Sequence, residues 1–218
     1  MYLTDYRALL IDCDDVLVDR DSGIWTALQP LLENHSGVLG REEVLAAFDE
    51  AVSTLYPRFS ELGFSGLLCF AHRQLAERFG LKASWEEGMS FARSVGNWSL
   101  FEDAPGAMLY LRKFYRLLVC CDRDAADREQ LCERLGITPE DLLSRVSKPL
   151  EDSVWLQDNN LQAKDILQVS RPPAEPPKSA GLCLICRGHG NDTQQCPADF
   201  CINSMADLVA QHQQSLHR

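Results

Sequence analysis

The feature that most constrains the fold is a short apolar segment near the start, residues 8–13 (ALLIDC), which leads into Asp12, Asp14 and Asp15. An apolar run of this length, charged only at its end, is typical of a strand buried in a parallel sheet. Similar runs follow much later, at 116–121, 166–170, 182–186 and 199–202. Helical patterns occupy about 104–114, 124–135, 150–162 and 204–214, so the later part of the chain alternates as βαβ units do.

Residues 20–98 interrupt this alternation, because they show helical periodicity at about 23–35, 41–56, 65–79 and 84–96. We therefore expect an α/β fold: a Rossmann-like parallel sheet core, formed by 1–18 and 100–218, with an inserted four-helix cap at 19–99. Ligands of open α/β sheets bind at the carboxyl ends of the strands. An insertion directly after the first strand is thus placed to act as a lid.

Composition excludes several classes of function. The 218 residues carry 21 Lys+Arg against 32 Asp+Glu, a net charge of −11, without a basic block that could hold nucleic acid or an anionic membrane surface. No apolar run reaches the roughly 18 residues that span a bilayer, and the N-terminus lacks the pattern of a signal peptide. We expect a cytoplasmic protein, monomer or homodimer, that acts on a small molecule and binds neither nucleic acid nor membrane.

The nine cysteines are predicted to be thiols, because most lie in apolar segments where a reduced Cys behaves as a small buried hydrophobe. Cys183 and Cys186 form a CxxC, but on a strand positions three apart point to opposite faces and cannot share a metal. His189, Cys196 and Cys201 follow without a partner CxxC, so a zinc site is not predicted.

Asp12 and Asp14 form an Asp-x-Asp pair at the end of the first predicted strand. The first carboxylate of such a pair can attack an electrophile, while the second protonates the leaving group and later activates water. Both can also supply oxygen ligands to Mg²⁺. By spacing alone, a solvated acidic turn is an equally good interpretation.

Residues 9–17 (LLIDCDDVL) resemble the first motif of the haloacid dehalogenase superfamily, a hydrophobic strand followed by D-x-D-x-[TV]-L. The similarity extends through residues 97–124 (NWSLFEDAPGAMLYLRKFYRLLVCCDRD), Lys148-Pro149, and the segments AGLCLICRG and PADFCINSMADL. It covers nearly the full chain and indicates the dehalogenase-like branch with a helical cap. The resemblance implies that Asp12 is the nucleophile, that Asp14 is the general acid/base, and that Lys148 lies near the Asp12 carboxylate. A surface lysine before a helix is the alternative for Lys148.

The second motif departs from the family pattern. The family ends a strand with Ser or Thr, often followed by Asn, and the matching residues here are Cys121 and Asp122. A thiol is a weak donor, so Cys121 would bind a phosphoryl oxygen less well than a hydroxyl, or would simply be the buried end of a strand. Asp122 would add a carboxylate where an anionic substrate is expected.

The fourth motif of the family, a strand, Gly-Asp and a further acid, has two candidate positions. Gln157-Asp158 keeps an acid but follows Lys148 too closely for a crossover helix. We prefer the strand at 166–170, which replaces Gly-Asp by Ser170-Arg171 and leaves Glu175 as the nearest acid. The resemblance makes Asp12 and Asp14 the Mg²⁺ ligands, with Glu175 or Asp158 as a third ligand. If Arg171 occupies the metal-anchoring position, Mg²⁺ binds weakly or not at all, because a guanidinium could neutralise the carboxylates itself; an exposed loop arginine is the alternative.

The function predicted first is hydrolysis of a small phosphate ester or related substrate through an aspartyl intermediate. The second hypothesis is a binding protein that keeps the haloacid dehalogenase-like (HAD-like) fold but has lost catalysis. The second and fourth motifs favour this loss, whereas Asp12, Asp14 and Lys148 favour catalysis. A 2-haloacid dehalogenase is the third hypothesis, because the dehalogenases of this family lack the second Asp of the first motif.

Overall fold

The computed structural model describes residues 2–174, 179–187 and 198–217 of the chain. Clustering of contacts divides them into two compact units. The first comprises residues 1–18, 100–122 and 131–218, and the second comprises residues 19–99 and 123–130. Each unit is described by itself below.

The first unit contains a six-stranded sheet in the order β3-β2-β1-β4-β5-β6, and every pair of neighbours is parallel. Its strands are β1 (Ala8–Asp12), β2 (Arg116–Cys120), β3 (Leu142–Leu143), β4 (Ile166–Ser170), β5 (Gly181–Ile185) and β6 (Phe200–Ile202). The predicted α/β class with a parallel sheet is confirmed. Only β3 was missed, because two residues are too short to produce a pattern.

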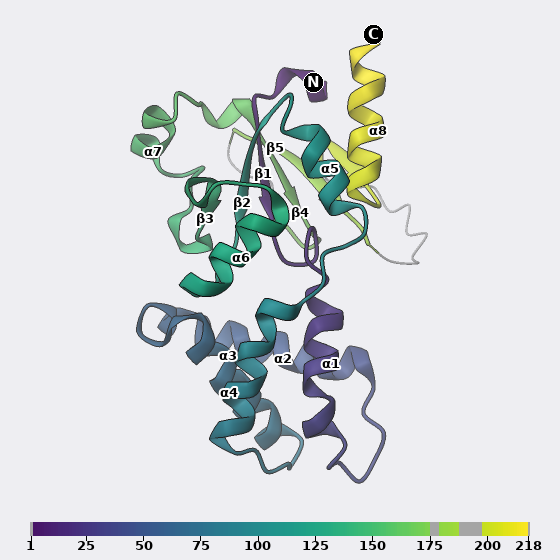
Figure 1. The fold of residues 1–218 in the computed structure, drawn as a ribbon, viewed down its shortest axis with the longest axis vertical. Helices are drawn as coiled ribbons and strands as arrows, with labels where there is room; N and C mark the ends of the chain where they lie inside the picture. Colours follow the sequence, from purple (N-terminus) through teal and green to yellow (C-terminus); the bar gives the residue numbers. More distant parts are fainter. Residues whose placement is uncertain (1, 175–178, 188–197, 218) are drawn as a thin grey trace. The chain divides into compact units, whose positions relative to one another are not determined.

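Four helices accompany the sheet: α5 (Ala104–Leu111), α6 (Ala125–Leu135), α7 (Ser153–Asp158) and α8 (Met205–Leu216). Figure 1 shows α5 and α8 side by side on one face of the sheet and α7 on the other. Leu10 of β1 and Leu118 of β2 form a buried cluster on the α7 side, against which Trp155 and Leu156 pack. Because successive strand residues point to opposite faces, Leu9 and Ile11, also fully buried, line the other side.

The second unit is helical in residues 19–99, with α1 (Arg20–Leu32), α2 (Arg41–Leu55), α3 (Phe59–Arg78) and α4 (Trp85–Arg93). The four helices agree with the four predicted periodic stretches. Residues 123–130, which we assigned to the core, cluster with this unit. The reason lies in two side chains: Arg123 lies over the rings of Phe64 and Trp98, and Asp124 accepts hydrogen bonds from the backbone of Phe64 and Ser65.

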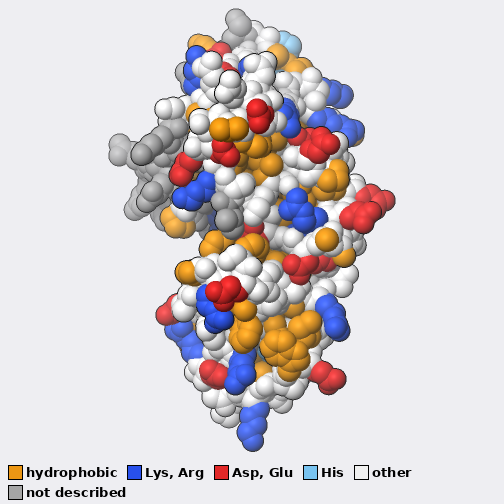
Figure 2. All heavy atoms as spheres, turned by 90° about the vertical axis from the view of Figure 1, so that its left-hand side faces the viewer, with side chains coloured by type: hydrophobic (Ala, Val, Ile, Leu, Met, Phe, Trp, Pro, Cys, Tyr) orange, Lys and Arg blue, Asp and Glu red, His pale blue; other side chains and the backbone are white. Residues whose placement is uncertain are grey.

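Charge and cysteine chemistry agree only in part with expectation. Figure 2 shows acidic and basic side chains interspersed on the face drawn, without a continuous basic patch. Among the described helices, none is long and apolar enough to cross a membrane. Of the cysteines in the described residues, seven are free thiols, as predicted: Cys13, Cys69, Cys120, Cys121, Cys132, Cys183 and Cys186. The prediction was wrong for Cys201, which is disulfide-bonded; it lies exposed on β6 rather than in the apolar core. His189 and Cys196 lie outside the described residues.

Candidate active site

Asp12 ends β1, the strand that lies between β2 and β4, and it is paired in register with Cys120. Burial raises the pKa of the Asp12 carboxyl, and the charge of Arg145 and a hydrogen bond from the Ser170 hydroxyl offset only part of this effect. Ser170 is itself buried and accepts a hydrogen bond of 2.9 Å from the Gln168 side-chain amide. A carboxylate is therefore held at the carboxyl end of the central strand by a hydroxyl and a cation.

Asp14 and Asp15 lie on a tight loop directly after β1. The amides of Leu17 and Val18 both donate to the Cys13 carbonyl at 2.9 Å, and the Asp15 amide donates to the Val18 carbonyl at 2.8 Å. Asp15 has a left-handed φ of 62°, a conformation that Asp tolerates better than most residues. This loop presents the two acidic side chains next to the end of the strand.

Arg187, the second residue after β5, fixes that loop. Its guanidinium donates to the Val16 carbonyl at 2.8 and 3.1 Å, pairs with Asp103 at 2.9 Å and lies 3.8 Å from the Phe101 ring centroid. Asp103 in turn accepts from the Met205 amide at the start of α8. In the sequence, Arg187 lies in a segment similar to the family, but nothing there indicated a role for it.

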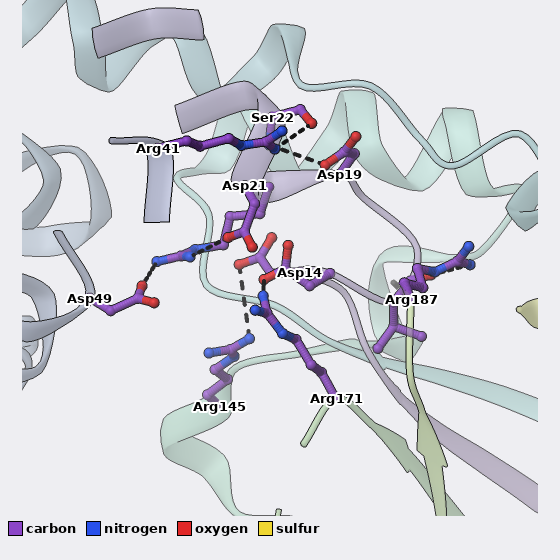
Figure 3. A network of polar contacts seen from close by, with 12 residues as sticks. Asp14, Asp19, Asp21, Ser22, Arg41, Asp49, Arg145, Arg171 and Arg187 are labelled. Atoms are coloured by element: carbon purple, nitrogen blue, oxygen red, sulfur yellow. Dashed lines mark hydrogen bonds and ion pairs between the residues drawn. The ribbon is translucent and has the colours of Figure 1, made fainter. Parts of the chain in front are cut away.

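The cation beside Asp12 and Asp14 is Arg145, which sequence reasoning did not identify. Its Nη2 lies 3.9 Å from Asp14 Oδ2, and its side chain is 43% exposed. Burial lowers the pKa of its guanidinium, but the carboxylates of Asp14, Asp12 and Asp122 outweigh burial and raise it. Figure 3 shows Arg145 and Arg171 both directed toward the region of Asp14. Arg145 was not predicted because it follows a strand of only two residues, which leaves no recognisable pattern in the sequence.

Lys148 was expected beside Asp12, and the structure shows it in an exposed ion pair with a different residue. Its ammonium forms an ion pair of 3.5 Å with Glu151, and its side chain is 68% exposed. After β3 the chain forms a 3₁₀ turn, Arg145–Ser147, and Lys148 then adopts a left-handed φ of 41°. Arg145, the first residue of this turn, therefore supplies the cation near Asp14, whereas Lys148, which follows the turn, lies at the surface.

The second-motif residues follow β2. Cys121 is fully buried, and its amide donates to the Leu143 carbonyl at 2.8 Å. Burial, followed by the negative charge of Asp12, raises the pKa of the neighbouring Cys120 thiol to about 12, which keeps this thiol protonated and poorly nucleophilic at neutral pH. Asp122 is only 5% exposed. It accepts hydrogen bonds from the Ser144 hydroxyl and the Arg145 amide, so its carboxylate is directed to the turn after β3.

The strand predicted at the preferred position of the fourth motif is confirmed, because β4 at Ile166–Ser170 pairs directly with β1. Arg171 ion-pairs with Asp15 at 2.8 Å, so its charge is engaged by the third acid of the first motif. Asp158 is exposed at the end of α7, shortly before Asn160, whose carbonyl accepts from Arg7 next to the start of β1. As a third metal ligand Asp158 is therefore excluded, since it lies at the opposite end of β1 from Asp12. Glu175 lies outside the described residues.

The donor set does not fit Mg²⁺. Asp14 pairs with Arg145, Asp15 pairs with Arg171, and Asp12 accepts from Ser170. Magnesium requires hard oxygen ligands in a nearly octahedral arrangement, and fixed guanidinium charges repel it. Within the described part of the chain no group of three or more His, Cys, Asp and Glu side chains is placed to hold a metal.

The comparison with known proteins gives a likeness of fold. No protein-family model matches the chain, and no curated protein sequence matches it significantly. Solved structures, in contrast, do match the chain over most of its length. The L-2-haloacid dehalogenase RSc1362 superposes with a TM-score of 0.70 at 18% identity, covering 95% of this chain and 99% of that one. The chain has the haloacid dehalogenase (HAD) fold.

Two further HAD structures show the range of this likeness. The L-2-haloacid dehalogenase from Xanthobacter autotrophicus, with chloropropionic acid covalently bound, has a TM-score of 0.68 at 13% identity and covers 95% of this chain and 98% of its own. The HAD-hydrolase YfnB from Bacillus subtilis, bound to magnesium, has a TM-score of 0.67 at 15% identity, covering 95% and 99%. Dehalogenases and a magnesium-bound hydrolase thus share the fold.

Proposed function

We propose that the chain is a hydrolase in which Asp12 forms a covalent ester with a small acidic substrate, without a metal ion, and that the substrate is a 2-haloacid. The observation that carries this proposal is the charge balance at the end of β1. Asp12 and Asp14 are faced by the guanidinium of Arg145, and no third acidic side chain of the described residues is placed with them to hold a metal. This revises the preference for a phosphate ester, which was based on the second Asp of the first motif.

The chemistry needs only groups that the chain supplies. A carboxylate oxygen of Asp12 attacks C2 of the substrate, the carbon–halogen bond breaks, and the halide leaves with the bonding electron pair. Water then hydrolyses the ester, which releases a 2-hydroxy acid and restores Asp12. Asp14 is the group available to take the proton from this water, because it lies two residues further on the same loop.

Arg145 provides the positive charge for an acidic substrate. A guanidinium has five N–H donors. The 3.9 Å ion pair with Asp14 engages one end of the Arg145 guanidinium, and the side chain remains 43% exposed. The other donors are available to a substrate carboxylate, which would be held next to the attacking oxygen of Asp12.

A small phosphate ester is the second candidate, and Asp14 favours it. A second Asp in the first motif is positioned as the acid that protonates the leaving group of an ester, a step that halide departure does not need. Without a divalent cation, however, Arg145 alone would offset the charge of a phosphate dianion, and we therefore rank this substrate class below the 2-haloacids. Weak or absent Mg²⁺ binding stays a prediction.

Turnover assays decide between these functions. Purified protein is incubated with a panel of 2-haloacids and a panel of phosphate esters, each with EDTA or with Mg²⁺, and halide or phosphate release is measured. We expect halide release that is insensitive to EDTA. Asp12→Asn should abolish it, and Asp14→Asn should slow it by about 10²–10⁴-fold, the usual contribution of a positioned acid/base.

Three outcomes would contradict the proposal. Phosphate release that requires Mg²⁺ would establish the second candidate. Full activity of Asp12→Asn would exclude the ester mechanism. A folded protein that turns over neither panel would favour the degenerate binding protein, which keeps the HAD fold without its chemistry.

A further inference from the structure

Asp122 is a buried carboxylate next to the candidate site that the proposed reaction does not use. The residue is only 5% exposed. Its Oδ1 accepts two hydrogen bonds, from the Ser144 hydroxyl at 2.9 Å and from the Arg145 backbone amide at 3.2 Å. Both donors lie in the turn that follows β3, so this carboxylate joins the end of β2 to that turn.

The strand pairing of β3 stops before the turn that follows it. The strand consists of Leu142 and Leu143 alone, and its pairing with β2 ends at Leu143, whose carbonyl accepts from the Cys121 amide. Ser144 and the following 3₁₀ turn lie beyond this ladder. The two bonds to Asp122 therefore continue the attachment of the chain one residue past the point where strand pairing stops.

The position of the Arg145 guanidinium depends on that attachment. An arginine side chain is long and flexible, and that of Arg145 is 43% exposed. Its reach to Asp14 is set by where its own backbone is held, and the backbone amide of Arg145 is the group that Asp122 binds. The negative charge of Asp122 also attracts the guanidinium.

We propose that Asp122 is a positioning residue, which holds the backbone of Arg145 so that its guanidinium lies beside Asp12 and Asp14. This inference rests on the proposed function, in which Arg145 is the cation that receives the substrate. It replaces the interpretation of Asp122 as a carboxylate that repels an anionic substrate. Asp122 itself touches no reacting atom; it acts through Arg145.

The test compares Asp122→Ala with Asp122→Asn. The alanine variant removes both hydrogen bonds, whereas the amide oxygen of asparagine can accept them again. Asp141→Ala is the matched control, because Asp141 precedes the other end of β3 and pairs with Arg116 at 2.9 Å, away from Arg145. The first readout, which needs no substrate, is the NMR order parameter of Arg145 Nε. The Nε signal of Arg145 is assigned as the one that disappears in Arg145→Lys. The second is kcat and KM for halide release.

We expect Asp122→Ala to lower the order parameter of Arg145 Nε to that of a mobile side chain and to reduce kcat/KM by about 10²-fold, the usual effect of a misplaced catalytic group. Asp122→Asn should keep the order parameter and most of the activity. Should Asp122→Ala fail to fold, Ser144→Ala removes one of the two bonds and is expected to cause an intermediate loss of order.

Several results would overturn the inference. They are an unchanged Arg145 order parameter in Asp122→Ala, a loss of order in Asp122→Asn as large as in the alanine variant, or the same loss of order in Asp141→Ala. If the wild-type protein turns over no substrate, the proposed function fails, and the order parameters still decide whether Asp122 positions Arg145.

Discussion

At the scale of single residues, the candidate site depends on which cation reaches the acidic loop. The family resemblance pointed to Lys148, yet the ion pair with Asp14 is made by Arg145, three residues earlier. Lysine and arginine are not equivalent there, because a guanidinium binds carboxylates with a planar array of donors, whereas an ammonium is a compact point charge. The change of residue therefore also changes which substrates the site can orient.

Replacing Asp12 should stabilise the folded protein at neutral pH. The pKa of Asp12 is raised in the fold, so folding favours its protonated form. Its contribution to stability is fully present below the unfolded pKa of about 4 and is lost as the pH rises through the folded pKa. Asp12→Asn removes this cost, and we expect its melting temperature at pH 7 to exceed that of the wild type.

The control for this prediction is the pH dependence of the difference. The gain of Asp12→Asn should shrink as the pH falls toward 4, since the wild-type carboxyl then becomes protonated. Asp158→Asn, at an exposed carboxylate, should change stability by less than about 0.5 kcal/mol at either pH. Equal melting temperatures of wild type and Asp12→Asn at pH 7 would contradict the prediction.

At the scale of elements, α3 is two helical segments joined at Gly63. This residue has φ 65° and ψ 178°, a conformation that is essentially confined to glycine. Just after it, the carboxylate of Asp124 accepts hydrogen bonds from the Phe64 and Ser65 amides, which begin the second segment. The predicted helix at 65–79 matches that segment.

Gly63→Ala should therefore destabilise the protein by about 1–3 kcal/mol, the usual cost of such backbone strain. The cause is the backbone, not a clash, because an added Cβ would meet only an Asp124 carboxylate oxygen at 3.8 Å. Gly66→Ala, three residues further in the same helix, is the matched control, and it should be neutral or stabilising by up to about 1 kcal/mol. Denaturant unfolding measures both, and equal effects of the two variants would contradict the prediction.

At the scale of the whole molecule, the chain forms two compact units, and the helical one is encoded by an insertion. Val18 and Leu100, which flank residues 19–99, are joined by an antiparallel bridge within the first unit. The Phe101 amide also donates to the Leu17 carbonyl at 2.9 Å. The two ends of the insertion thus emerge side by side, so the sheet unit does not depend on the insertion for its continuity.

Replacing residues 19–99 by a short glycine linker should leave the sheet unit folded, with a cooperative unfolding transition. The beginning of α6 should be the exception, because Arg123 and Asp124 would lose their partners Phe64, Ser65 and Trp98. Hydrogen exchange is expected to be faster for residues 125–130 than for 131–135. A product without cooperative unfolding would show that the first unit needs the second.

The sequence by itself determined the parallel sheet, the helical insertion and the position of Asp12. Each of these features follows from local periodicity: apolar runs of strand length that end in acids, and a stretch with only helical spacing. The strand at the preferred position of the fourth motif was also predictable, because the alternative position follows Lys148 too closely for a crossover helix. Tertiary structure alone decided the charge partners. Arg145 reaches Asp14 from a turn after a two-residue strand, Arg187 binds the acidic loop from the end of β5, and Asp122 faces Ser144. These pairs join residues 22 to 171 positions apart, and such contacts leave no local pattern, because they depend on which strands the sheet places side by side.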